Sequence, residues 1–154
     1  MRIRKARWED LDYIIKSIHN ICIYENNINS KINTKQPLKN YYKWIIAKEI
    51  VDNDYLILIA EEKWEKVWIL TWEISGKNSF WNYKKFSDLN FLYVEEEHRK
   101  KWYAKKLCNR FFEWAKKKWS DRVLLNALGD NFRAIEFYEK LWFSTHTVNL
   151  WKNL

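Results

Sequence analysis

Six short segments of the chain carry the alternating or continuous hydrophobic residues that are typical of β strands. They span residues 3–7, 55–60, 67–74, 88–94, 122–128 and 143–150. Only the polar residues 61–66 separate the second segment from the third, and this spacing predicts a hairpin. We therefore expect a sheet that takes its strands from the whole length of the chain.

Four further segments place their apolar residues at helical spacing. The first begins near Asp10, and residues 25–37 after it are predicted to form a loop or a broken helix. The apolar face of this first helix carries Leu11, Ile14, Ile15, Ile18 and Cys22. The other helices are expected over residues 38–51, 102–118 and 131–141. The order of the elements predicts a mixed sheet with helices on both faces.

Length and composition limit the class of protein. A chain of 154 residues with 47% hydrophobic residues suits a single packed domain over residues 1–154. No apolar run approaches the roughly 20 residues of a membrane span, and the first ten residues are too charged for a signal peptide. We expect a soluble, cytoplasmic protein without a membrane partner. Cys22 and Cys108 are too few and too isolated for a metal site, so no metal is expected.

The net charge of +8 is concentrated in one segment. Residues 98–118 contain nine Lys or Arg and one acid, Glu113, and this excess equals that of the whole chain. Such a run is usually a solvated helix face, but it also fits an anion site at the start of that helix. Basic residues are interleaved with aromatic residues, so a nucleic-acid-binding module is an alternative. No recognised nucleic-acid-binding motif is present, however, and we do not expect nucleic acid as a partner.

Tryptophan and glycine occur in unusual proportions. The chain has 11 Trp and 2 Gly, whereas an average protein of this length has about 11 Gly. Trp64 falls in the expected hairpin turn and Trp119 at the end of an expected helix, where glycine is common. We hypothesise that several Trp positions are opal codons that the source organism reads as glycine; the alternative is a protein truly rich in Trp. The same suspicion applies to Trp68, Trp72, Trp102 and Trp142.

Two motifs are candidates for chemistry. Residues 94–104 lead from an expected strand into a helix start, where unpaired N–H groups and the helix dipole favour an anion. In this turn Arg99 is followed by Trp102 and Ala104. The spacing resembles the cofactor motif of the general-control-related N-acetyltransferase (GNAT) superfamily. In that motif Arg or Gln stands at the place of Arg99, Gly at the place of Trp102, and Gly or Ala at the place of Ala104. The second element of that family is matched by Asn131, Ala134, Phe137, Tyr138 and Phe143, with Trp142 in a glycine place.

The resemblance implies an α/β (α+β) fold with a mixed, mostly antiparallel sheet of six to seven strands and about four helices. It implies acetyl-CoA as co-substrate and a small-molecule or peptide amine as acceptor, and it leaves a homodimer open. The residues 25–37 and 76–85 and the final strand are expected to form the acceptor pocket. The implied cofactor-binding residues are Leu92, Tyr93, Val94, Arg99, Lys100, Lys101, Trp102, Tyr103, Ala104, Lys105, Asn131, Ala134 and Phe137.

The resemblance also implies catalytic roles. Backbone N–H groups near Tyr93 and Val94 would hold the thioester carbonyl, and Tyr138 would protonate the departing thiolate. The attacking amine must first lose a proton, for which Asp88 corresponds to the base position of some members and Glu73 is a second candidate. The alternative within the same fold is an inert protein that only binds a partner.

Overall fold

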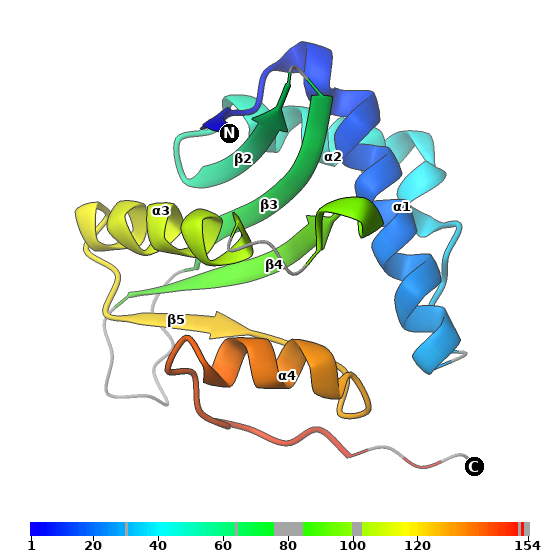
Figure 1. The fold of residues 1–154 in the computed structure, drawn as a ribbon, viewed down its shortest axis with the longest axis vertical. Helices are drawn as coiled ribbons and strands as arrows, with labels where there is room; N and C mark the ends of the chain where they lie inside the picture. Colours follow the sequence, from blue (N-terminus) through cyan, green and yellow to red (C-terminus); the bar gives the residue numbers. More distant parts are fainter. Residues whose placement is uncertain (30, 64, 76–84, 100–102, 151, 153–154) are drawn as a thin grey trace.

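Five strands form one sheet in the computed structural model, which describes the chain except for residues 30, 64, 76–84, 100–102, 151 and 153–154 (Figure 1). The strands are β1 (Arg2–Lys5), β2 (Tyr55–Glu62), β3 (Glu65–Ser75), β4 (Phe86–Val94) and β5 (Arg122–Leu125). They lie in sequence order across the sheet. The first four are antiparallel to their neighbours, whereas β4 and β5 are parallel.

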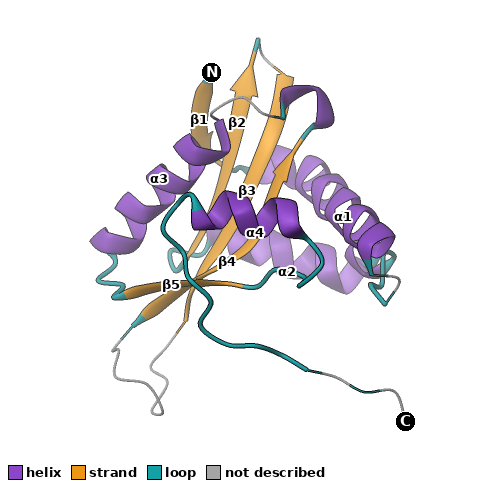
Figure 2. Cartoon of the chain, turned by 60° about the horizontal axis from the view of Figure 1, so that its bottom comes forward, coloured by secondary structure: helices purple, strands orange, loops and turns teal. Residues whose placement is uncertain are grey.

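Helices cover both faces of this sheet, as the sequence predicted. They are α1 (Leu11–Ile28), α2 (Asn40–Val51), α3 (Tyr103–Lys117) and α4 (Phe132–Glu139), with short 3-10 turns at Trp8–Asp10, Gln36–Leu38 and Glu96–His98. Figure 2 shows α3 and α4 in front of the sheet and α2 behind it. Among the described residues, no helix is both long and apolar enough to cross a membrane.

Strand β2 explains why the sheet is covered twice. Successive side chains of a strand point to opposite faces, and the interior of β2 is hydrophobic at every position. Ile57 and Ile59 pack with the buried residues of α1 and α2. Leu56 and Leu58 belong to the second core cluster, which is centred on Phe111 of α3. Because both faces of β2 are buried, the strand is a continuous apolar run without polar alternation.

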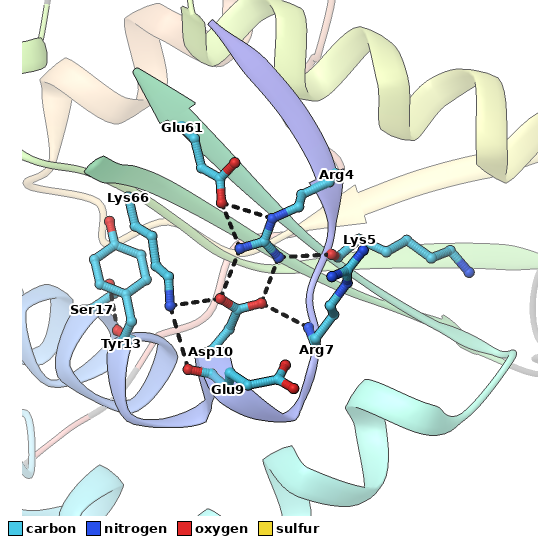
Figure 3. A network of polar contacts seen from close by, with 9 residues as sticks. All are labelled: Arg4, Lys5, Arg7, Glu9, Asp10, Tyr13, Ser17, Glu61 and Lys66. Atoms are coloured by element: carbon cyan, nitrogen blue, oxygen red, sulfur yellow. Dashed lines mark hydrogen bonds and ion pairs between the residues drawn. The ribbon is translucent and has the colours of Figure 1, made fainter. Parts of the chain in front are cut away.

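A buried carboxylate ties the first strand to the first long helix (Figure 3). Asp10, whose side chain is 2% exposed, accepts two hydrogen bonds from the Arg4 guanidinium, at 2.6 and 3.0 Å. Lys66 of β3 lies 2.7 Å from the same carboxylate, and the backbone N–H of Arg7 donates to it at 2.8 Å. Arg4 also contacts Glu61 of β2. The cluster therefore joins three strands to the start of α1.

Strand β4 contains a β-bulge at Asn90, next to the end of its pairing with β5. On the β3 side, Thr71 pairs with Phe91 while residue 72 pairs with Leu89, so Asn90 is the extra residue. A bulge bends its strand and increases the local twist. On the other side, the parallel pairing with β5 ends at Leu89, opposite Leu125. The bulge therefore immediately follows the last paired residue of β4. Figure 1 shows β4 and β5 diverging beyond their paired ends.

Two expectations about the strands were wrong. Residues 143–150 form no strand and residues 126–128 lie beyond β5, so the described sheet has five strands where six to seven were expected. After Phe143, Val148 and Leu150 are 73% and 91% exposed, so the rest of this segment buries no apolar face that would hold it against the sheet. Residues 25–37 were expected to form a loop or a broken helix. The first four of them continue α1, to which Ile28 adds one more half-buried apolar residue at helical spacing.

Candidate active site

A cavity of about 680 Å³ opens where β4 and β5 diverge. Its walls come from the last residues of α1, the second half of β4, the start of α3, the residues after β5, and α4. The lining residues are Ile21, Tyr24, Glu25, Leu89, Asn90, Phe91, Leu92, Tyr93, Val94, Arg99, Ala104, Lys105, Asn126, Ala127, Asn131, Arg133, Ala134, Glu136, Phe137, Tyr138, Lys140 and Leu141. The cavity therefore unites both sequence motifs.

The open edge of β4 forms one wall. Beyond Leu89, β4 pairs with β3 on one side only, and its edge toward β5 borders the cavity over residues 90–94. Backbone groups on an unpaired strand edge can bind a ligand by the hydrogen bonds that a further strand would otherwise make. This is the place where the sequence predicted that the backbone near Tyr93 and Val94 holds a carbonyl. The Tyr93 hydroxyl is engaged elsewhere, accepting from Asn20 and donating to Glu95.

The turn that leads into α3 supplies positive charge. Arg99 lines the cavity, and its Nε donates to the Val94 carbonyl at 3.2 Å, which holds the side chain beside the open strand edge. Ala104 and Lys105 line the cavity from the first turn of α3. Lys100, Lys101 and Trp102, which the sequence also assigned to this site, lie outside the described residues.

The start of α4 forms the facing wall. Asn131 is buried, and its side-chain oxygen accepts a hydrogen bond from the Ala134 N–H at 3.2 Å, so it caps the helix. Asn131, Ala134 and Phe137 all line the cavity. The cap and one face of α4 therefore bring these three residues together at the cavity.

Tyr138 lies further along the same helix. Its ring packs edge-on against Phe137 and Phe143, with ring centroids 5.2 and 5.7 Å away, while the residue still borders the cavity. Burial raises the pKa of Tyr138 well above its usual value, and the nearby Cys108 and Glu25 raise it further. The phenol is therefore fully protonated near neutral pH, as a hydrogen-bond or proton donor requires.

The structure does not bring every expected residue to this cavity. Asp88 and Glu73 face each other across β4 and β3, but neither lines the cavity. The charge of Glu73 instead acts on Glu49 of α2. Tyr103 is also absent from the lining, and its hydroxyl donates to Glu62 at 2.7 Å. Within the described residues, no group of three His, Cys, Asp or Glu side chains could hold a metal ion.

One acidic residue of the cavity was not singled out from the sequence. Glu25 lies on the last turn of α1, faces the cavity and is partly buried. Burial raises the pKa of its carboxyl group. Residues 25–37 were expected to form a loop or a broken helix, so the sequence offered only the general expectation that this segment borders an acceptor pocket.

Comparison with known proteins identifies the family. Residues 30–143, which include both motifs and the open strand edge, match the acetyltransferase (GNAT) family model. The chain belongs to the GNAT acetyltransferase family. No curated protein matches it.

Solved structures support the GNAT fold over the whole chain. A point mutant of the BH1408 protein from Bacillus halodurans is similar, with a TM-score of 0.88 at 15% identity over 100% of this chain and 99% of that one. A GCN5-related N-acetyltransferase from Ralstonia eutropha has a TM-score of 0.79 at 15% identity, covering 99% and 97%. An aminoglycoside 6′-N-acetyltransferase from Acinetobacter haemolyticus has a TM-score of 0.73 at 18% identity, covering 100% and 99%.

Proposed function

We propose that this GNAT protein transfers the acetyl group of acetyl-CoA to a primary amine by direct attack. The observation that carries the proposal is the cavity where the open edge of β4, the start of α3 and Tyr138 of α4 meet. Acetyl-CoA, when bound, supplies an activated acyl group on a thiol leaving group. The residues of this chain would bind it, orient its carbonyl and manage the protons.

The charge distribution in the cavity supports a phosphorylated co-substrate. Arg99 and Lys105 stand at the entry to α3, and Arg133 lies at the start of α4. The first turn of a helix also presents unpaired N–H groups and a partial positive charge. Two helix starts and three basic side chains around one cavity favour an anion such as a diphosphate. Lys100 and Lys101 would add to this charge by their position in the sequence.

The strand edge and Tyr138 would then act on the reacting atoms. Backbone N–H groups of β4 near Tyr93 and Val94 would donate to the thioester carbonyl and stabilise the negative charge that develops on its oxygen. The Tyr138 phenol would donate to the departing sulfur. A phenol is protonated at neutral pH even at its usual pKa of about 10, and burial raises the pKa of Tyr138 further, so this group is present as a donor before the reaction starts.

The decisive test combines binding and turnover. Calorimetric titration with acetyl-CoA should show saturable binding, and a panel of a polyamine, an aminoglycoside, free lysine and a lysine-containing peptide should release free coenzyme A thiol. Tyr138→Phe should lower kcat by about 10²- to 10⁴-fold without changing acetyl-CoA affinity. Tyr41→Phe is a matched control, because Tyr41 is exposed on α2 and lies outside the cavity.

Three results would contradict the proposal. An unchanged kcat in the Tyr138→Phe variant would remove the phenol from the mechanism. Saturable binding of acetyl-CoA without turnover of any amine would favour the inert binding protein. Binding to single-stranded nucleic acid that weakens with salt, with no binding of acetyl-CoA, would favour the nucleic-acid alternative.

A further inference from the structure

Glu25 is an acid without a structural partner in the described chain. No described cation lies within ion-pair distance of its carboxylate, whereas Glu136, the other acid of the cavity, pairs with Lys140 at 2.7 Å. Glu25 also lies in the last turn of α1, where the helix dipole disfavours negative charge. Neither an ion pair nor the helix dipole therefore explains a carboxylate at this position.

The position of Glu25 complements the rest of the cavity. The basic residues that favour a phosphorylated ligand come from the α3 turn and α4, whereas Glu25 enters from α1. The charge of Glu25 raises the pKa of Tyr138, and both residues line the same cavity. A partly buried carboxylate with a raised pKa is suited to bind a cation and to accept a proton.

We propose that Glu25 binds the ammonium group of the acceptor amine and takes the proton that its nitrogen must lose before it attacks. This inference rests on the proposed function of the cavity. One proton of the ammonium passes to the Glu25 carboxylate, and the free electron pair of the nitrogen forms a bond to the acetyl carbonyl carbon. The carbon–sulfur bond then breaks, and its electron pair stays on the sulfur, which takes the Tyr138 proton. The second nitrogen proton restores the phenol.

The test measures amine binding separately from turnover. Glu25→Gln keeps the shape of the side chain and removes its charge. Calorimetry with each amine of the panel should show about 10- to 100-fold weaker binding, while acetyl-CoA binds as before and so confirms the fold. Glu139→Gln, the same change at an exposed residue of α4 outside the cavity, should leave both unchanged.

The outcomes separate the two proposals. Equal amine affinity in Glu25→Gln and the unaltered chain, or no saturable amine binding by the unaltered chain, would overturn the role of Glu25. Amine binding that depends on Glu25, in a chain that never acetylates the bound amine, would support the ammonium site and refute the acetyltransferase proposal.

An independent observation concerns the identity of two tryptophans. Trp119 and Trp142 have φ angles of 62° and 69°, in the left-handed region that favours glycine. Each follows a helix and makes the same pair of hydrogen bonds. Ser120 N–H donates to the Ala115 carbonyl and Trp119 N–H to Lys116. After α4, residues 143 and 142 donate in the same way to residues 138 and 139. Both ends are Schellman motifs with Trp in the glycine position.

The side chains give no reason for tryptophan at these positions. Trp119 is 85% exposed and Trp142 is 96% exposed, so neither indole gains burial that could offset its backbone strain. Lys63, next to Trp64, also has a positive φ, of 52°. Trp64, which the sequence questioned as well, lies outside the described residues.

We infer that glycine occupies positions 119 and 142 of the protein as its source organism makes it, through opal codons read as glycine. Glycine at these positions would account for both observations, because it adopts a positive φ without strain and has no side chain to leave exposed. The inference does not depend on the activity of the cavity.

Two measurements test it. Peptide mass spectrometry of the protein from its source should find glycine at both positions and tryptophan at Trp44 and Trp114. In the chain as written, Trp119→Gly and Trp142→Gly should each raise the Tm by about 2–4 °C. Trp44→Gly, within α2, should instead lower it. Tryptophan at both positions of the native protein, or a lower Tm for both variants, would overturn the inference.

Discussion

Replacing Asp10 by Asn tests the polar cluster that ties β1 to α1. Asn keeps the size of the side chain but places an amide NH₂ where an anionic oxygen accepted hydrogen bonds. Whichever way the amide lies, a donor then faces Arg4, Lys66 or the Arg7 N–H. Because the side chain is 2% exposed, water cannot replace the lost acceptor.

The magnitude follows from the burial of the partners. Removing one member of a buried ion pair costs about 3–5 kcal/mol. Arg4 keeps Glu61 at 2.6 Å, so we expect the lower end, about 3 kcal/mol. For a chain of this length that corresponds to a Tm lower by about 6–12 °C. Glu9→Gln removes a neighbouring but exposed carboxylate and should change the Tm little.

The pH dependence gives the sharper check. Burial alone would raise the pKa of Asp10, but hydrogen bonds from Arg4 and Lys66 hold it well below its usual 3.8. The charged form therefore stabilises the fold above pH 3.8, and this contribution is lost as the pH falls below that value. Denaturant unfolding should show a large difference between Asp10→Asn and the unaltered chain at pH 7 and a smaller one at pH 3. A difference that stays constant or grows at pH 3 would refute the reasoning.

Three further changes probe other parts of the chain. Burial, with the charges of Glu73 and Asp52, raises the pKa of Glu49 to about 7; Glu49→Gln should therefore stabilise the fold at pH 8 by about 1–2 kcal/mol after solvent screening, and not at pH 4, as urea unfolding would show. Asn131→Ala should cost about 1 kcal/mol through the lost helix cap and weaken acetyl-CoA binding in calorimetry. Lys105→Gln should weaken acetyl-CoA binding, and reduce the salt dependence of that binding, more than Lys106→Gln does. Of these two lysines only Lys105 lines the cavity.

Local patterns were sufficient to predict most elements. The continuous apolar run of β2 and the stripe of α3 are properties of neighbouring residues, and the packing of Ile59 and Phe111 on opposite faces follows from them. The divergence of β4 and β5 was not predictable in this way. It depends on the bulge at Asn90, which is a mismatch in register between two strands, and no residue in β4 marks it in the sequence.

The same distinction applies to the site. Tyr138 and Asn131 were predictable because a helix with a fixed spacing places both on one face. Asp88 and Glu73 were chosen by strand position, but the direction of a strand side chain changes with a one-residue shift in register. Both lie outside the cavity, whereas Glu25, which begins the segment expected to be a loop or a broken helix, lines it.

The division of the cavity between chain segments explains why the acceptor is harder to infer than the co-substrate. The region that matches the GNAT family begins at residue 30, after α1 has ended at Ile28. Ile21, Tyr24 and Glu25 therefore form a wall of the cavity from outside the matched region. On the proposed function, the matched region binds acetyl-CoA, the shared co-substrate, and α1 contacts the acceptor amine, which differs between members. Acceptor preference should consequently follow the last two turns of α1, while the residues of the two motifs determine the affinity for acetyl-CoA.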